Sequence, residues 1–119
     1  MTAYELYKRA LSYNFETSTS EYNDYYMGFI NILLSENYTL NNTILRMRGQ
    51  EELMECPFIT SKDDEIPFEP ELANTVLPLG LAAHLAKEDE QQLYNVYIDM
   101  YTNARKRVLY EIPVVFEAM

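Results

Sequence analysis

Residues 70–86, PELANTVLPLGLAAHLA, decide the fold predicted for this chain. Apolar residues recur there at helical spacing and line one stripe, namely Leu72, Val76, Leu79 and Ala83. Four small residues let another helix approach closely, namely Gly80, Ala82, Ala83 and Ala86. Pro78 lacks a backbone N–H, so we expect it to kink this helix or to divide it in two.

Three further helices are predicted before this segment, and the first two lie within about residues 2–37. Apolar residues at helical spacing predict the first over about residues 2–13. The pattern Ser18-x-x-Glu21 is typical of a capping box and predicts a second helix over about residues 20–37. The apolar residues of this second helix cover more than one face, so we expect it to be buried on two sides or to lie at an interface.

The region between the second helix and residue 70 changes in character. Asn41-Asn42 is predicted to cap a short third helix that stops near Gly49. Residues 51–70 contain three prolines and predict a long connection, with a short β-hairpin as the alternative. Its charged tip is predicted to contact another protein, through Lys62, Asp63, Asp64 and Glu65.

The C-terminal part predicts one more helix, over about residues 89–110. The apolar tail after it predicts an extended arm that contacts another protein, through Pro113, Val114, Val115 and Phe116. The fold class expected is mainly α, a small bundle of four to five helices with a long central loop or short β-hairpin. Residues 1–110 form its single domain, and residues 111–119 form the arm.

Charge limits the kinds of partner. The 119 residues carry 9 Lys+Arg against 19 Asp+Glu, a formal net charge of -10, which repels nucleic-acid backbones and anionic lipid surfaces. Cys56 is the single cysteine in the sequence, so an internal disulfide is excluded and a reducing compartment is favoured. We expect no membrane association, because no apolar stretch is long enough to span a bilayer.

The residue types that carry most enzyme chemistry occur here without their usual patterns. His84 is the single histidine, so one chain lacks a two-histidine metal site. Cys56 precedes Pro57 outside any recognisable nucleophile motif, and no glycine-rich phosphate loop occurs. We therefore expect a protein that is not an enzyme, with no catalytic residue, metal or cofactor.

The last predicted helix carries two adjacent apolar stripes. One contains Leu93, Tyr97, Met100, Ala104 and Val108, and it has the spacing of ordinary core. The second stripe exceeds what a thin helical domain needs for its core. We expect it to contact a neighbouring subunit, through Tyr94, Ile98, Tyr101 and Arg105.

Three stretches within residues 42–110 carry a family resemblance. They are Asn42-x-x-Leu45-Arg46-x-x-Gly49, then CPFITSKDDEIPF at residues 56–68, then LPLGLAAHL at residues 77–85, followed by an acidic cluster and a tyrosine-rich helix. In order and character this part of the chain resembles the head-to-tail connector (adaptor) proteins of tailed bacteriophages and prophages. The N-terminal 40 or so residues match that family only in being helical.

The resemblance implies a structural virion protein of the head–tail junction, assembled in the host cytoplasm. About twelve copies would form a ring under the portal protein, extend the DNA channel and provide the platform for tail or neck proteins. The arm at Pro113, Val114, Val115 and Phe116 would contact the portal or a neighbouring copy. DNA would pass an acidic lumen without specific binding. Two alternatives stay open: a neck stopper or tail-completion protein, and a small acidic regulator that mimics DNA and binds a host protein.

Overall fold

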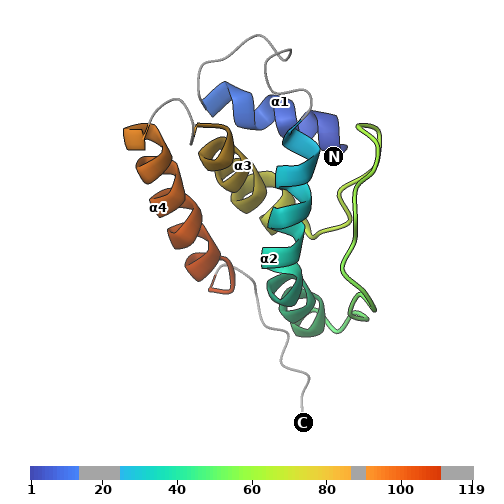
Figure 1. Ribbon diagram of the computed structural model, residues 1–119. Helices are drawn as coiled ribbons and strands as arrows, with labels where there is room; N and C mark the ends of the chain where they lie inside the picture. Colours follow the sequence, from blue (N-terminus) through green and yellow to red (C-terminus); the bar gives the residue numbers. More distant parts are fainter. Residues whose placement is uncertain (14–24, 87–90, 111–119) are drawn as a thin grey trace.

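The computed structural model describes residues 1–13, 25–86 and 91–110, and these are mainly helical (Figure 1). Within them lie α1 (Ala3–Tyr13), α2 (Tyr26–Met47), the π-helical turn η2 (Leu72–Val76), α3 (Leu77–Ala86) and α4 (Gln91–Val108). The predicted class, a small bundle of helices with a long irregular connection, is confirmed.

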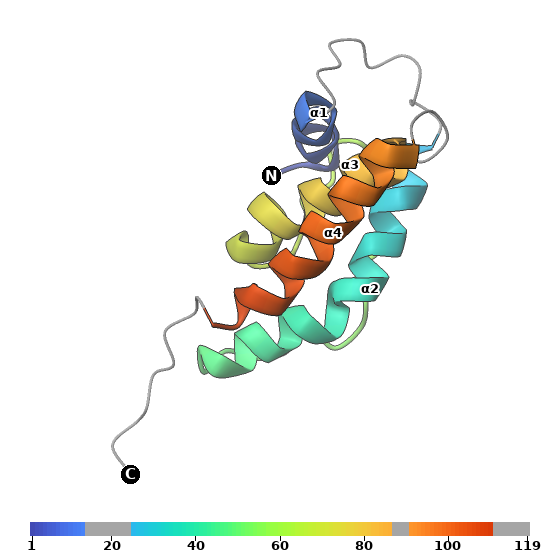
Figure 2. The same ribbon diagram turned by 90° about the vertical axis from the view of Figure 1, so that its left-hand side faces the viewer.

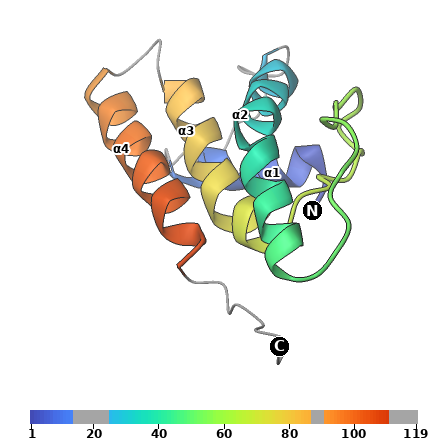
Figure 3. The ribbon, with the colours of Figure 1, turned by 90° about the horizontal axis from the view of Figure 1, so that it is seen from below.

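The bundle is organised around α3. In Figures 1 and 3, α2, α3 and α4 lie side by side with α3 in the middle, and α1 crosses the layer at one end. Every residue of α3 is buried except the half-buried His84. This helix therefore forms the centre of the core, as expected for a segment that is apolar on nearly all sides.

Gly80 permits the close packing on both sides of α3. A Cβ atom at this position would lie 2.6 Å from Cδ2 of Leu33 on α2 and 2.9 Å from Cε1 of Tyr101 on α4. Both distances are shorter than a van der Waals contact, and both neighbouring side chains are themselves buried. The absence of a side chain at Gly80 thus sets how near α2 and α4 approach the central helix.

The interruption predicted at Pro78 takes the form of the π-helical turn η2. The N–H of Leu77 donates to the carbonyl of Leu72, five residues back, so the chain enters α3 from a wider turn. Pro78 has no N–H to offer the carbonyl of Asn74, four residues back. Arg9 of α1 donates to that oxygen at 3.3 Å. The side chain of Arg9 therefore supplies the hydrogen bond that the backbone of Pro78 cannot donate.

The short third helix predicted after Asn41 is wrong, because α2 continues without a break to Met47. Asparagine favours helix N-caps when its side chain bonds to the next turn of backbone. Here the side chains of Asn41 and Asn42 bond instead to backbone groups of the long connection. The helix tolerates them in its interior because the side-chain oxygen of each accepts a hydrogen bond from the connection.

The predicted stop near Gly49 is confirmed. Gly49 has a φ of 71°, and its N–H donates to the carbonyl of Arg46 at 3.1 Å. The N–H of Gln50 reaches the carbonyl of Leu45 at 2.8 Å. These two bonds form a Schellman motif, which glycine favours because it adopts positive φ without steric cost.

The N-terminus of α1 is held by a capping box that the sequence reasoning did not single out. Thr2 donates its N–H to the carboxylate of Glu5 at 2.9 Å, and its hydroxyl accepts from the N–H of Glu5 at 3.1 Å. These bonds lower the pKa of Glu5. The box predicted at Ser18 and Glu21 lies outside the described residues.

We expect Gly80→Ala to lower the free energy of unfolding by about 1–3 kcal/mol, because the added methyl group overpacks the core between α2 and α4. Gly28 is the matched control, since it is exposed on α2 and an added Cβ would meet no atom within 4 Å. Gly28→Ala should raise the free energy of unfolding by about 0.5–1 kcal/mol through helix propensity alone. Urea unfolding followed by circular dichroism measures both, and a Gly80→Ala variant as stable as Gly28→Ala would contradict the packing described.

Candidate functional site

The connection between α2 and η2 runs along the outer edge of the molecule, beyond α2 (Figures 1 and 3). The hairpin alternative predicted for it does not form. Its one β-bridge joins Glu65 to Thr2 at the N-terminus, rather than to another part of the connection. Side chains of α2 fix the rest of its course.

Asn31 forms the first of these attachments. Its side-chain oxygen accepts from the N–H of Ile59 at 2.7 Å, and its side-chain nitrogen donates to the carbonyl of Ile59 at 3.0 Å. The amide of asparagine carries one acceptor and a pair of donors, so it can pair with a single residue as a neighbouring strand would. Ile59 itself is buried against the helical core.

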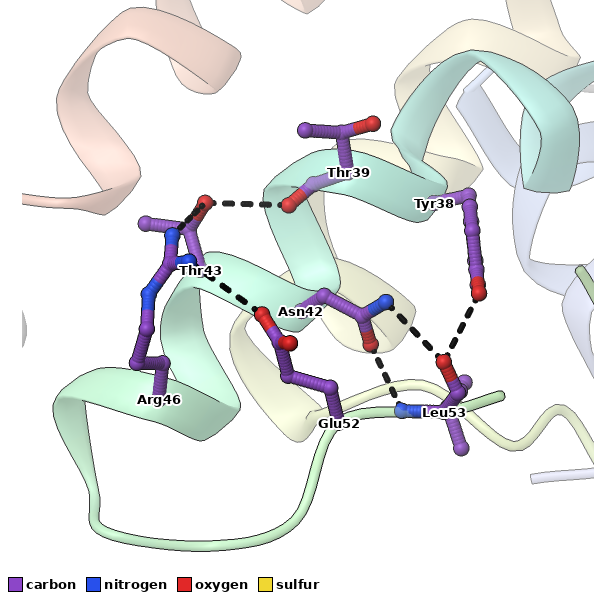
Figure 4. Close-up of polar contacts among 7 residues, drawn as sticks. All are labelled: Tyr38, Thr39, Asn42, Thr43, Arg46, Glu52 and Leu53. Carbon is purple, nitrogen blue, oxygen red and sulfur yellow. Dashed lines mark hydrogen bonds and ion pairs between the residues drawn. The ribbon is translucent and has the colours of Figure 1, made fainter. Parts of the chain in front are cut away.

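Asn42 forms a second attachment of the same kind, shown in Figure 4. Its oxygen accepts from the N–H of Leu53 at 2.8 Å, and its nitrogen donates to the carbonyl of Leu53 at 3.2 Å. The hydroxyl of Tyr38 donates to the same carbonyl at 2.7 Å. We call the pairs Asn31–Ile59 and Asn42–Leu53 the asparagine clamps.

A third group of contacts secures the end of the connection. Buried Asn41 accepts from the N–H of Glu69 at 2.8 Å. Arg48 pairs with Glu69 at 2.9 Å and also with Glu71. The hydrogen bond from Arg48 holds the pKa of Glu71 below its ordinary value, and the same pairs raise the pKa of Arg48. The chain therefore enters η2 from a fixed position beside the end of α2.

Between the two clamps the chain displays apolar side chains to solvent. Met54 is 98% exposed and Phe58 is 72% exposed, and Cys56 between them is exposed as well. The backbone N–H groups of residues 54–56 and 58 form no hydrogen bond within the described part of the chain. Exposed apolar groups on a fixed segment with free backbone donors are typical of a surface that contacts another protein.

The charged tip of the connection docks onto the N-terminus of α1. The carbonyls of Asp64 and Lys62 accept from the N–H groups of Ala3 and Tyr4 at 2.9 and 3.0 Å. The N-terminal amine of Met1 pairs with Glu65 at 2.9 Å. The tip thus satisfies helix donors that would otherwise lack partners.

Within the tip, the Asp64 carboxylate accepts from the N–H groups of Thr60 and Ser61 at 2.9 and 3.0 Å. These two bonds hold the pKa of Asp64 below its ordinary value. The side chains of Lys62, Asp63 and Glu65 stay exposed. Contact of the tip with another protein stays a prediction.

The stripe assigned to a subunit interface on α4 is partly used inside the chain. Tyr101, predicted to contact a neighbouring subunit, is buried within its own chain. Its hydroxyl accepts from buried Asn37 at 2.9 Å and donates to Glu36 at 2.8 Å, and burial raises the pKa of this phenol. Arg105 donates to the side-chain oxygen of Asn37 at 2.8 Å. Tyr101 and Arg105 therefore join α4 to α2 of the same chain.

The remaining two members of that stripe, Tyr94 and Ile98, are half-buried. Contact of Tyr94 and Ile98 with another subunit stays a prediction. The predicted contact residues of the arm, Pro113, Val114, Val115 and Phe116, lie outside the described residues.

The outward face of α4 exposes two apolar side chains, one of which was predicted to lie in the core. Figure 2 views the molecule from this side. Val96 is 53% exposed and Met100, predicted to be core, is 43% exposed. An open depression of about 460 Å³ lies beside them, lined by Leu79, Met100, Asn103, Lys106 and Arg107. The signal available in the sequence was the pair of cations Lys106 and Arg107, nearly two helical turns beyond the apolar i, i+4 pair Val96 and Met100.

His84 and Cys56, the two residues considered for catalysis, lie in different parts of the structure. The ring of His84 stacks on Phe29 with centroids 5.1 Å apart, and Cys56 lies in the exposed segment between the clamps. Among residues 1–13, 25–86 and 91–110, no three or more His, Cys, Asp or Glu side chains are grouped so as to hold a metal ion. Within the same ranges, no helix has the length and apolar character needed to cross a membrane.

The chain matches no protein-family model, no curated protein and no solved structure. A function must therefore be argued from features of this chain alone. They are a fixed apolar segment at one edge, a depression with a basic rim at the other, and a strongly acidic composition.

We expect Asn31→Ala and Asn42→Ala to release the connection locally while α2 stays helical. Each substitution removes both hydrogen bonds of one clamp, so amide exchange at Ile59 or Leu53 respectively should accelerate about tenfold, equivalent to 1–2 kcal/mol. Asn95→Ala is the control, because Asn95 is exposed on α4 and its bond to Gln91 is local. Hydrogen exchange followed by NMR resolves the three variants, and unchanged protection at Ile59 in Asn31→Ala would show that the clamp does not hold the segment.

Proposed function

We propose that this chain is a structural subunit that assembles with copies of itself as a ring, as a head-to-tail connector of a tailed bacteriophage or prophage. The resemblance of residues 42–110 to that family supplies the class. The observation that carries the proposal is the fixed segment between the asparagine clamps, which presents Met54 and Phe58 to solvent. Exposed apolar side chains on an ordered segment do not stabilise a monomer, whereas in an assembling subunit they can be buried against a partner.

The residues that carry the resemblance have structural roles, and these roles support the proposed function. Asn42 holds the connection, Gly49 ends α2, and Gly80 sets the spacing of the three central helices. Asp64 orders the tip that docks onto α1. The resembling positions together fix one helical frame and one surface segment, and neither needs a catalytic group.

The charge of the chain fits a channel for DNA. A formal net charge of -10 for each copy, repeated around a ring of about twelve, would line the assembly with negative charge. Such a lumen repels the phosphate backbone and lets DNA slide without being held. The same charge suits a small regulator that mimics DNA, so oligomeric state is the property that separates these two functions.

Native mass spectrometry of the purified chain, alone and mixed with the portal protein of the same genome, tests the proposal. We expect ring-sized assemblies that join the portal in fixed stoichiometry. Assembly on a neck or tail protein without portal binding would indicate the stopper or tail-completion function instead. A discrete monomer or dimer that ignores the portal and neck proteins would contradict the connector function and favour the acidic regulator.

A further inference from the structure

We propose, resting on the ring assembly above, that neighbouring copies join head to tail through two described surfaces. The acidic, apolar segment 51–58 of one copy docks into the depression between α3 and α4 of the next. We call these surfaces the clamped segment and the α3–α4 depression. The occupant of the depression is thus a second copy of this chain.

The two surfaces are complementary in their apolar parts. The clamped segment projects Met54 and Phe58, whose side chains are largely exposed to solvent. The depression is open, measures about 460 Å³, and includes Leu79 and the exposed Met100. Burial of large apolar side chains in such a hollow is the usual main source of affinity at a protein interface.

The two surfaces are also complementary in charge. Glu51, Glu52 and Glu55 are exposed in the clamped segment. Glu52 pairs with Arg46 at 3.3 Å, whereas Glu51 and Glu55 have no ion pair within the described part of the chain.

The rim of the depression carries exposed Lys106 and Arg107, in a chain where acids outnumber bases by 19 to 9. Lys106 and Arg107 follow Met100 by six and seven residues on α4, so the positive charge lies at the C-terminal end of the depression. This is the end at which the acids of the clamped segment would dock, and the match favours correct pairing over other contacts.

The positions of the two surfaces fit a ring. Figures 1 and 3 both show the connection at one edge of the helical layer and α4 at the opposite edge. A contact between two different patches of the same chain repeats from copy to copy and closes into a ring when the rotation allows. The clamps keep the segment ordered before contact, so docking costs little conformational entropy.

A disulfide scan tests the contact directly, because native Cys56 lies between Met54 and Phe58. Met100→Cys places a second thiol in the depression, within reach of Cys56 of the next copy when the segment is docked. Thr102→Cys is the control, since Thr102 is exposed on α4 but does not line the depression. A disulfide requires Cα atoms closer than about 7 Å, so linkage reports position.

Under mild oxidation, with and without portal protein, we expect Met100→Cys to form a ladder of disulfide-linked multimers, at about tenfold the yield of Thr102→Cys. Adding Met54→Ser and Phe58→Ser should abolish the ladder. These two side chains are exposed, so we expect their replacement to leave the fold intact, and circular dichroism would check this. Linkage of Met100→Cys no greater than that of Thr102→Cys in both conditions would overturn the proposal.

Two further outcomes separate this contact from its alternatives. Combining Cys56→Ser with Met100→Cys should leave no ladder, and symmetric dimers formed equally well without Cys56 would overturn the head-to-tail contact. A chain ending at Tyr110 should still form the ladder. A ladder that appears only on that truncation, and not in the full chain, would overturn the proposal and identify the C-terminal arm as the occupant of the depression. Portal binding in ring stoichiometry without the Cys56 linkage would leave the connector function standing and refute this contact alone, whereas a ladder without portal binding would do the reverse.

Discussion

The hydrogen bonds from asparagine side chains of α2 to the backbone of the long connection are the interaction on which the ordered course of that connection, and the surface it presents, depends. A segment without regular structure must find partners for its peptide groups, and here Asn31 and Asn42 each supply a donor and an acceptor to one residue. Asn41 adds a bond to Glu69 where the chain turns toward η2. A long connection that would otherwise be mobile is thereby held against the helices at several points.

The helical frame supplies the rigidity that these clamps need. α3 is apolar on almost all sides, and Gly80 lets α2 and α4 pack close against it. Around this contact, Asn37, Tyr101 and Arg105 link α2 to α4 through buried and half-buried hydrogen bonds. Buried polar groups that are fully paired specify one arrangement of helices rather than several. On this fixed helix, Asn31 and Asn42 present their side chains to the connection at a fixed spacing.

The elements predicted correctly from the sequence are those fixed by local interactions. α1 and α4 follow from apolar spacing, and the end of α2 follows from Gly49, whose backbone conformation is a local requirement. Asn41 and Asn42 were misassigned as helix caps because that preference is local, whereas their partners lie 28 and 11 residues away. Tertiary contacts between distant residues decided the outcome, and a single sequence does not show them.

The connection and α4 were predicted only in part, because tertiary contacts decide which of their side chains are exposed. The connection was expected to be interactive, but its predicted contact region was the tip at Lys62–Glu65, and the exposed apolar segment lies nearer α2. On α4, Met100 and Tyr101 exchange their predicted environments, because adjacent helical positions differ by about 100° and the position of α3 decides which faces inward. Sequence spacing identifies a helix with two apolar stripes, but which stripe is buried depends on where the neighbouring helices lie.

The most direct measurement of the central claim is a cryo-electron microscopy reconstruction of the chain assembled with its portal. The account predicts that residues 51–58 of each copy lie in the α3–α4 depression of the next, with the pairs Asn31–Ile59 and Asn42–Leu53 intact. A reconstruction in which that segment faces solvent, or has left both asparagines of its own α2, would contradict it.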